Sequence, residues 1–243
     1  MTKIKMIFSC GVVVLSMVLQ SCLSDDNDVP STFPNALVTV KTNADGSTYF
    51  QLDENTKLYA NNINKRLYDG KEVRALINYT VLNTDDTKNT KDIHVNWIDS
   101  IRTKELIHSL DGKIPDNIGD NSIEVINDWV TVLEDGYLTL RVRALWGIPS
   151  KTHYLNLISG INNKDPYEVE LRHNANGDKG ERLGDALIAF KLKGLDIKEG
   201  QKLTLKWKSF DGSDKRTTFS VNKASSKSYS NIISHESLKN NIK

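Results

Sequence analysis

The chain has 243 residues, and its shares of hydrophobic residues (38%) and charged residues (26%) are typical of a folded globular protein. Its 32 Lys and Arg residues nearly balance its 31 Asp and Glu residues, so the formal charge at pH 7 is +1. A balanced chain lacks the basic excess that recruits nucleic acid, and we therefore expect no nucleic-acid partner.

Residues 1–21 are typical of a cleaved secretory signal peptide. Lys3 and Lys5 supply the positive N-terminal part, and an apolar stretch runs from Met6 to Leu19. A transmembrane helix needs about 20 apolar residues, and neither this stretch nor a later one reaches that length. We expect the mature chain, whose charge falls from +1 to near −1 with the loss of the two lysines, not to cross a membrane.

Cys22 lies directly after Leu19-Gln20-Ser21, a pattern that resembles the lipobox of bacterial lipoproteins. The resemblance implies that Cys22 becomes the first residue of the mature chain. It also implies that Cys22 carries a thioether-linked diacylglycerol and an N-acyl chain such as palmitate. Two or more acyl chains anchor a protein stably to a membrane, whereas one does so only marginally. The alternative is an ordinary signal peptide that ends near a cysteine.

The only other cysteine, Cys10, lies in the segment expected to be removed. The mature chain would then contain no cysteine pair for a disulfide or a metal site. Asp25, Asp26 and Asp28 follow the anchor and resemble the surface-export tether of lipoproteins from the Bacteroidetes; a solvated linker is the alternative. We expect an outer-membrane location with the body of the protein facing the cell surface.

Residues 22–36 are polar, contain Pro30 and Pro34, and predict a flexible tether. Beyond them, short strand-like runs are separated by turn residues such as Asp45-Gly46, a strong hairpin signal. The runs are 37–42, 49–52, 57–60, 73–82 and 93–98. Such closely spaced strands predict a small closed barrel, which leaves no exposed strand edge. We place this barrel at 37–112, with 99–110 as a bent strand rather than a helix.

The run 73–82 shows the clearest alternation of the first block. In a β-strand, successive side chains point to opposite faces, so this alternation divides the run into two faces. The face predicted to point to the core holds Val73, Ala75, Ile77, Tyr79 and Val81, and the opposite face holds Arg74, Leu76, Asn78 and Thr80.

The second block follows residues 111–121, whose two glycines and Pro115 predict a connection between domains. It contains strand-like runs with turn residues between them and no helical pattern. The runs are 123–133, 137–145, 152–158, 167–173, 185–192, 203–209 and 216–221. They predict a β-sandwich at 120–222, and the aperiodic residues 223–243 predict a mobile tail.

Three segments taken together with the lipobox carry a family resemblance. They are Val95-Asn96-Trp97-Ile98-Asp99-Ser100, the run 135–147 that begins Asp-Gly-Tyr and ends Trp-Gly, and the run 170–178 (Glu-Leu-Arg-His-Asn-Ala-Asn-Gly-Asp). In this order they resemble the NigD-like family of Bacteroidetes lipoproteins. The resemblance covers nearly the whole mature chain. It implies an all-β fold in which a small OB-like barrel is followed by a β-sandwich. It also implies a bacteriocin-associated immunity or accessory role, and it transfers no functional residue.

One strand face in the second block is a candidate binding surface. Tyr137, Thr139, Arg141 and Arg143 alternate with the apolar residues of the run 137–145. Arginine pairs in a fork with carboxylate or phosphate and stacks on flat groups, so this face could bind such a group or a sugar. The alternative is a solvated strand face whose arginines pair with Glu168 and Glu170.

Two histidines and one loop are weaker candidates. His153 and His173 are in phase with apolar neighbours, which favours structural histidines over a catalytic base. The loop after His173 carries Asn174, Asn176 and Asp178, whose oxygens could bind Ca²⁺. Asn-Gly-Asp is also ordinary turn chemistry, and the loop lacks the carboxylate density of a calcium site. We expect no metal and no cofactor.

The sequence contains no nucleophile elbow, phosphate-binding loop or zinc-protease motif. We therefore expect a non-enzymatic binding or interaction protein whose partner is a protein, a peptide or a glycan. A structural role in an envelope complex is the first alternative, and a hydrolase is the second. Three tryptophans alternate in step with apolar residues that we expect to face a core: Trp97, Trp146 and Trp207. This argues against a glycan site built from tryptophan.

Overall fold

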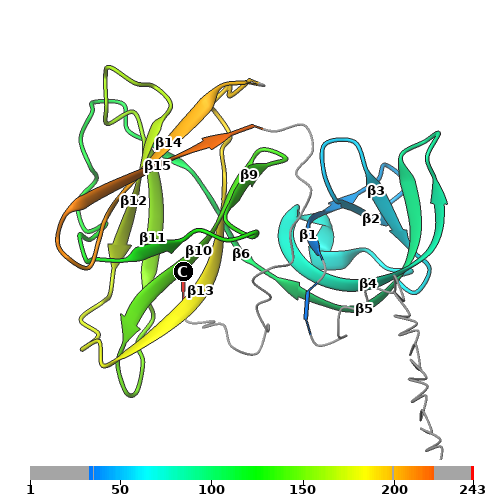
Figure 1. Ribbon diagram of the computed structural model, residues 1–243, viewed down its shortest axis with the longest axis horizontal. Coiled ribbons are helices and arrows are strands. Elements are labelled where there is room, and N and C mark those ends of the chain that lie inside the picture. Colours follow the sequence, from blue (N-terminus) through cyan, green and yellow to red (C-terminus); the bar gives the residue numbers. More distant parts are fainter. Residues whose placement is uncertain (1–32, 35, 199, 222–241) are drawn as a thin grey trace, which may run out of the picture.

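The computed structural model describes residues 33–221, apart from 35 and 199, and residues 242–243 (Figure 1). The expected signal peptide, Cys22, nearly all of the expected tether and residues 223–241 of the expected tail lie outside the described residues. In the described part, regular structure consists of strands and one short 3-10 helix. None of the helical structure described there is long and apolar enough to span a membrane.

The first domain is a closed five-stranded barrel with the strand order β1-β2-β3-β5-β4. The β3–β5 pair is parallel and the other pairs are antiparallel. The elements are β1 (Ala36–Thr42), β2 (Thr48–Gln51), β3 (Lys57–Ala60), the 3-10 helix η1 (Leu67–Gly70), β4 (Val73–Asp85) and β5 (Thr90–Ser100). This is the strand order of an OB barrel, so the first half of the predicted fold is confirmed.

Local chemistry in the barrel follows the sequence signals. The β1–β2 turn closes because Asp45 accepts hydrogen bonds from the backbone and hydroxyl of Ser47, and because Gly46 adopts a φ of 88°. Inward residues such as Val38, Phe50 and Ile93 are fully or almost fully buried in one cluster. Burial of apolar surface at roughly 25 cal/mol per Å² closes the barrel around them.

The second domain is a sandwich of two sheets (Figure 1). One sheet has the order β6-β13-β10-β8, and β9 shares the edge of β10 that β8 also uses. The other sheet has the order β15-β14-β12-β11-β7. The strands are β6 (Arg102–Glu105), β7 (Ile107–His108), β8 (Glu124–Ile126), β9 (Val132–Glu134), β10 (Tyr137–Trp146), β11 (Tyr154–Ser159), β12 (Glu168–Asn174), β13 (Arg182–Lys191), β14 (Lys202–Lys208) and β15 (Asp214–Ser220).

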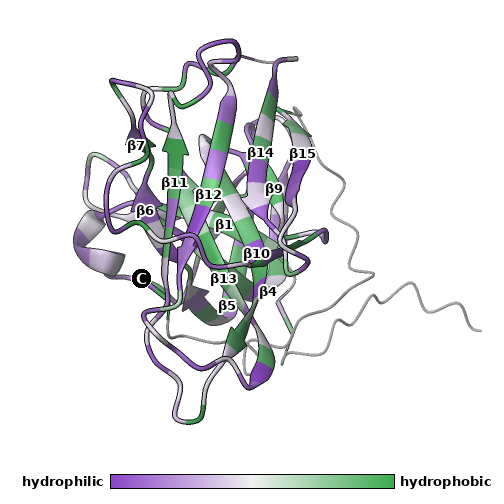
Figure 2. Cartoon of the chain, turned by 90° about the vertical axis from the view of Figure 1, so that its left-hand side faces the viewer, coloured by the Kyte–Doolittle hydropathy of each residue, from purple (hydrophilic) through white to green (hydrophobic). Residues whose placement is uncertain are grey.

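The apolar faces predicted for this domain meet in one core. Hydrophobic and hydrophilic residues alternate along the sandwich strands (Figure 2). Leu138, Leu140 and Val142 of β10 lie against Leu203 and Leu205 from the facing sheet in a single cluster. Because alternate residues of β10, β11, β12, β13 and β14 enter this core, the sandwich predicted from the sequence is confirmed.

Two boundaries differ from the sequence-based expectation. Residues 99–110 are extended, as expected, but β6 joins the sheet of β13 and β7 joins the sheet of β11. The sandwich therefore begins at Arg102, and the expected barrel limit of 112 is wrong. The expected single run 123–133 is two short strands, β8 and β9, because a turn held by Asp128 and Thr131 interrupts it.

The end of the chain also differs from the expected mobile tail. Ile242 is buried in the sandwich core and pairs with His153. The backbone of Lys243 donates to the carbonyl of His153 and accepts from the amide of Leu155. These two residues are held by backbone bonds and apolar burial, so the expectation of mobility fails for them.

Candidate functional site between the two domains

The two domains are joined through the outer faces of their strands. A third apolar cluster combines Leu37 and Leu76 of the barrel with Leu187 and Ala189 of β13. Residues 36–40 of β1 and 74–78 of β4 are consequently buried on both faces. This burial explains why β1 is a nearly continuous apolar run. The domains form one packed unit at this joint.

Arg74 is the polar centre of the joint, and its side chain is 0% exposed. Its Nη2 donates to Glu134 Oε1 at 2.6 Å, Nη1 donates to Thr39 Oγ1 at 2.9 Å, and Nε donates to Thr139 Oγ1 at 3.3 Å. A buried charge is tolerated only when it is paired and hydrogen-bonded in this way. The sequence predicted that Arg74 lies on the face of its strand opposite the barrel core. Arg74 does lie on that outer face, but the sandwich packs on it and buries the side chain.

Tyr137, the first residue of the predicted binding face, lies at the rim of this joint and is 1% exposed. Its hydroxyl donates to Glu72 Oε2 at 2.9 Å, and Lys191 Nζ donates to the same oxygen at 3.0 Å. Burial and the neighbouring Glu72 carboxylate raise the pKa of Tyr137 well above its ordinary value. Although partial burial raises the pKa of Glu72, the hydrogen bonds from Lys191 and Tyr137 keep it below its ordinary value.

Beside the joint lies a cleft of about 820 Å³ between barrel and sandwich. Pockets at domain interfaces are frequent ligand sites. The residues that line it are Tyr68, Lys71, Glu72, Val73, Leu76, Asp99, Ser100, Ile101, Arg102, Thr103, Lys104, Glu105, Tyr137, Leu187, Lys191 and Ile242. The lining therefore draws on η1, β4, β5, β6, β10, β13 and the chain end, segments that lie far apart in the sequence.

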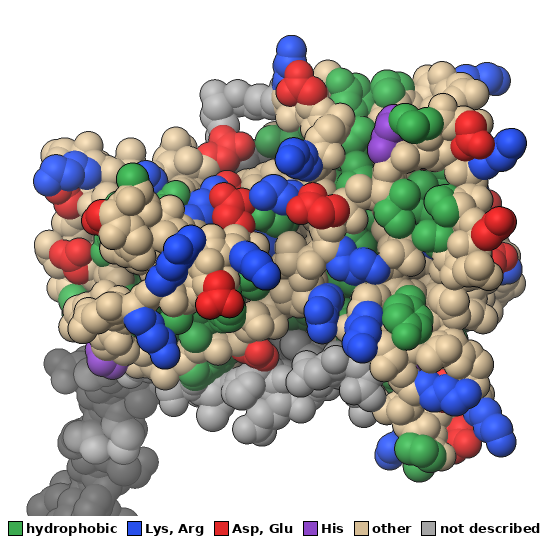
Figure 3. All heavy atoms as spheres, turned by 180° about the vertical axis from the view of Figure 1, so that it is seen from behind, with side chains coloured by type: hydrophobic (Ala, Val, Ile, Leu, Met, Phe, Trp, Pro, Cys, Tyr) green, Lys and Arg blue, Asp and Glu red, His purple; other side chains and the backbone are tan. Residues whose placement is uncertain are grey.

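Cations and acids are mixed in the cleft. Lys71 and Arg102 are exposed, whereas Lys104 is half-buried and donates to the Leu155 carbonyl at 2.6 Å and to Asn156 Oδ1 at 2.7 Å. Burial, aided by the charge of Arg102, lowers the pKa of Lys104. Positive and negative side chains also intermix across the middle of the molecule seen from behind (Figure 3). Such a surface suits a partner that carries both signs of charge.

Arg141 and Arg143, the other two residues of the predicted face, lie further along β10. Arg141 Nη1 donates to Asp128 Oδ2 at 2.8 Å, and Arg143 Nε donates to Asp185 Oδ1 at 2.6 Å. Asp185 also accepts from Arg141, and although burial raises its pKa, the two arginines keep it below its ordinary value. The structure therefore does not bring these arginines to Tyr137 in one pocket.

The expected ion-pair partners of these arginines were wrong. Glu168 and Glu170 belong to β12 in the other sheet, where Glu168 pairs with Arg216 and Glu170 pairs with Arg172 and Lys206. Strand alternation predicts which residues share a face but not which strand or turn lies beside them in the sheet, so Asp185 and Asp128 could not be identified from spacing.

His153 and His173 do come together. His173 Nε2 lies 3.0 Å from His153 Nδ1, and His153 Nε2 lies 3.2 Å from Asp178 Oδ2. Trp146 stacks on His153 with ring centroids 4.0 Å apart. Burial lowers the pKa of His173 to about 4, and backbone donors from Gly147 and Lys151 lower the pKa of Asp178 to about 2.

This histidine group lies beneath the loops and is not among the residues that line the cleft. The second ring nitrogen of His173 lies 3.0 Å from the Ser122 carbonyl oxygen, so all four ring nitrogens contact protein groups. The arrangement therefore matches structural histidines that tie Trp146 and the loop of Asp178 to the sheet.

The residues of the candidate calcium loop act as turn and loop ties. Asn174 Oδ1 accepts the backbone amide of Asn176, and Asp178 accepts the backbone amide of Lys151. A Cβ at Gly147 would lie 1.9 Å from Asp178 Oδ1, so the carboxylate is held tightly against that glycine. Among the residues that the structure describes, no group of three or more His, Cys, Asp or Glu side chains could hold a metal ion.

Sequence reasoning missed most of the cleft. Glu72 directly precedes β4, whereas Lys104 belongs to β6 and Lys191 to β13. Each alone has the pattern of a solvated charge. The one signal available was β1, where Ala36-Leu37-Val38 places apolar residues on both faces. That pattern indicates a covered barrel wall, and a covered wall implies a domain interface beside it.

An OB-type barrel packed onto a β-sandwich defines a class of two-domain all-β proteins. The NigD-like N-terminal OB domain matches residues 37–101, and the NigD-like C-terminal beta sandwich domain matches residues 106–221. These matches cover well over half of the chain, and the protein belongs to the NigD-like family. The resemblance seen in the sequence is thus confirmed.

Several solved structures share this fold. A protein described as toxin-related from Parabacteroides distasonis is 30% identical with a TM-score of 0.63, over 77% of this chain and 93% of that one. A protein of unknown function from Bacteroides vulgatus is 23% identical with a TM-score of 0.64, over 84% and 98%. A NigD-like immunity protein from Bacteroides caccae is 21% identical with a TM-score of 0.51, over 75% and 90%. Comparison with curated proteins gave no match.

Proposed function

We propose that the protein is a lipid-anchored protein of the outer membrane that binds a segment of another protein in the interdomain cleft and catalyses no reaction. The observation that carries this proposal is the cleft itself, which is large, mixed in charge and lies beside an apolar cluster shared by both domains. Lys71, Arg102 and Glu105 of its lining are exposed and would pair with opposite charges along an extended peptide.

The absence of catalysis is proposed from the arrangement of titratable groups. A hydrolase needs a histidine and a carboxylate that face a concave pocket. Here the paired histidines and Asp178 are enclosed by the protein, and the lining described for the cleft includes acids, lysines and tyrosines but no histidine.

The class of partner is proposed from relatives. The Bacteroides caccae structure is called an immunity protein, and the Parabacteroides distasonis structure is called toxin-related. We extend these descriptions to this chain as a proposal: its partner is a secreted antibacterial protein such as a bacteriocin, which the cleft intercepts at the cell surface.

A charge-reversal variant tests the binding site. The mature chain from Leu23 is immobilised and exposed to bacteriocin-containing culture supernatants, and captured proteins are identified by mass spectrometry. Lys71→Glu with Arg102→Glu changes the cleft, whereas Lys164→Glu with Lys179→Glu makes the same charge change at exposed positions outside its lining. We expect the cleft variant to lose a protein that the parent and the control both retain. Equal capture by all three contradicts the proposal.

The anchor is tested separately on intact cells. We expect the protein extracted from the membrane fraction to begin at Cys22 and to carry the mass of a diacylglycerol and an acyl chain. Cys22→Ser should release the protein from that fraction. A different N-terminus without acyl mass would refute the anchor, and protease treatment of whole cells decides whether the body faces outward.

One observation favours an assembly role as the second candidate function. Leu145 and Leu183 lie directly opposite each other on β10 and β13 and are 42% and 59% exposed, with exposed Ile148 close in sequence. Exposed apolar groups in register mark interaction surfaces. This patch lies at the far end of β10 rather than at the domain boundary. An assembly role predicts that Leu183→Ser reduces the size of the complex extracted in mild detergent.

A further inference from the structure

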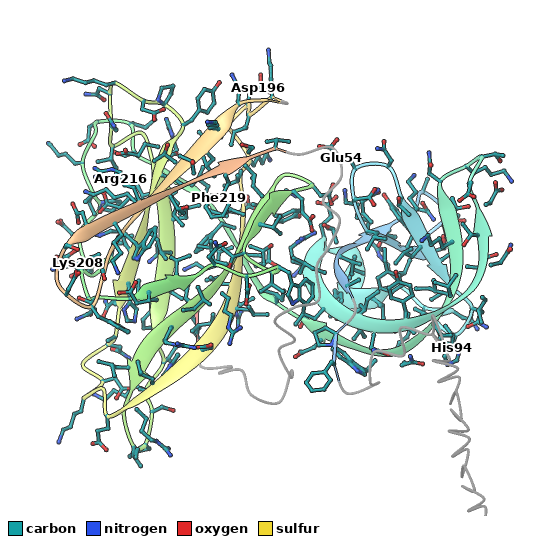
Figure 4. All side chains as sticks on the ribbon, viewed as in Figure 1. Glu54, His94, Asp196, Lys208, Arg216 and Phe219 are labelled. Carbon is teal, nitrogen blue, oxygen red and sulfur yellow. The ribbon has the colours of Figure 1, made fainter. Side chains whose placement is uncertain are left out.

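The barrel has a second exposed surface that the cleft does not include. The sandwich covers the outer faces of β1 and β4, where Thr39 and Arg74 are fully buried. The outer face of β2 and β3 is left open, and Tyr49, Lys57 and Tyr59 are half-exposed there. His94 of β5, labelled in Figure 4, faces solvent on the side of the barrel remote from the sandwich.

The two tyrosines form one flat surface. Phe50 and Leu58 are paired in register inside the barrel, so Tyr49 and Tyr59 form the next pair on the opposite face. Their ring centroids are 6.3 Å apart and their planes differ by 33°. Lys57 Nζ lies 5.1 Å from the centroid of the Tyr49 ring, which fixes an ammonium group beside the rings.

A carboxylate completes the surface. Asp92 of β5 is the register partner of Tyr59 and is exposed. Partners in register on adjacent strands share a face, so Asp92 projects from the same face as Tyr59, and its Oδ2 lies 3.5 Å from Asn83 Nδ2 of β4. The platform of Tyr49, Lys57, Tyr59 and Asp92 therefore offers two aromatic faces, an ammonium donor and a carboxylate acceptor.

Strand pairing alone does not account for the position of this platform. A cross-strand aromatic pair stabilises a sheet by about 0.2–1 kcal/mol wherever it occurs. The outer face of strands 2 and 3, with the β1–β2 and β4–β5 loops, is the surface on which OB barrels hold oligosaccharides and oligonucleotides. In this chain those loops are 43–47 and 86–89, and their Asn, Asp, Ser, Thr and Lys side chains can donate to and accept from hydroxyl groups.

Charge distinguishes between the two ligand classes. Residues 37–101 contain eight Lys and Arg against nine Asp and Glu. Sequence-independent binding of single strands needs a positive groove along the phosphates, and Asp92 beside Tyr59 would repel them. An oligosaccharide needs only aromatic faces for its C–H groups and polar side chains for its hydroxyls.

We propose that Tyr49, Tyr59, Lys57 and Asp92 form a binding platform for a neutral oligosaccharide. Sugar rings stack on the two tyrosines, Asp92 accepts from sugar hydroxyls, and Lys57 donates to sugar oxygens. The sequence argued against a glycan site because its tryptophans alternate with core-facing apolar residues. The platform uses tyrosines instead. The site is independent of the cleft and of the protein partner proposed for it.

Calorimetric titration of the mature chain from Leu23 tests the platform. The probes are chitohexaose, cellohexaose, xylohexaose and mannohexaose, with an oligothymidylate as the nucleic-acid probe. We expect at least one oligosaccharide to bind at millimolar concentration or below and oligothymidylate not to bind. The proposal is overturned if no oligosaccharide binds the parent chain, or if oligothymidylate binds in their place.

Variants then locate the binding. Tyr49→Ala with Tyr59→Ala should weaken oligosaccharide binding by about tenfold or more, since loss of stacking removes at least about 1.4 kcal/mol. Tyr49→Phe with Tyr59→Phe retains the rings and should bind within a few-fold of the parent. Tyr154→Ala removes an exposed tyrosine from the sandwich, and the cleft variant leaves the platform intact; both should bind normally. Unchanged binding in the alanine pair, with its circular dichroism unchanged, overturns the proposal.

Discussion

Two groups of paired arginines and carboxylates lie beside the outer face of β10, in different environments. At its start, beneath the barrel, Arg74 and Glu134 are buried, and each donor nitrogen of Arg74 has a protein acceptor. Further along the same face, Arg141 and Arg143 share Asp185 at the edge of the solvent. The chemistry of the pairs is the same, but only the first joins two domains.

The difference shows how burial changes what an ion pair does. A pair at the surface contributes little because water solvates the separated charges equally well. A buried pair costs free energy to desolvate, and loss of one partner leaves an unpaired charge in an apolar site. The joint therefore gains geometric specificity from Arg74, whereas the Asp185 cluster orders side chains on a strand that the core already holds.

The largest expected effect breaks the buried pair. Arg74→Ala removes the guanidinium that pairs with the buried Glu134 carboxylate and should lower the free energy of unfolding by about 3–5 kcal/mol. Arg74→Met with Glu134→Leu removes both charges and should recover most of that loss. Urea denaturation followed by far-UV circular dichroism measures both. An Arg74→Ala protein as stable as the parent contradicts the account of the joint.

The pH dependence of stability tests a third polar group, the buried pair of His153 and His173 with Asp178. Burial lowers the pKa of His173 to about 4, so the folded protein favours its neutral form. That stability is complete above the ordinary pKa of about 6.5. It is lost as pH falls toward 4, by roughly 3 kcal/mol. The lowered pKa of Asp178 adds a further loss between pH 3.8 and about 2.

Denaturation at pH 7 and pH 4.5 measures this dependence. His173→Asn keeps a polar side chain but does not titrate, so its stability should change less between the two values than that of the parent. An identical change in parent and variant would assign the acid sensitivity to other groups.

An intermediate effect is expected at Arg141, which pairs with both Asp128 and Asp185. Arg141→Ala removes a partner from two largely buried carboxylates and should cost about 1–3 kcal/mol. Urea denaturation measures this loss in the free energy of unfolding, which we expect to be smaller than that of Arg74→Ala and larger than that of Arg143→Ala. A loss as large as that of Arg74→Ala would remove the distinction on which the comparison rests.

The smallest effect is expected at Arg143, whose side chain is 40% exposed. Asp185 keeps Arg141 as a partner after Arg143→Ala, and solvent reaches the site, so the loss should stay below about 1 kcal/mol. Denaturation in low and high salt checks this directly, because a screened surface pair loses its contribution as salt rises.

The sequence predicted local features well because they depend on alternation and turn chemistry. The inward faces of β10, β13 and β14 and the turn at Asp45-Gly46 were read correctly. Contacts between domains were not, because Arg74 has the pattern of a solvated residue and becomes buried only when the sandwich packs on β4. Among the candidate site residues, Tyr137 lines the cleft, while the binding role of Arg141 and Arg143 remains a prediction.

The unity of the two domains is the claim on which the cleft depends, and hydrogen exchange during urea unfolding tests it most directly. Peptides from β2–β3 in the barrel and from β12–β14 in the sandwich should lose protection at one shared midpoint in the parent chain. In Arg74→Ala the two midpoints should separate. Two separate midpoints in the parent chain itself would show that the domains unfold independently, and would contradict a cleft held by a rigid joint.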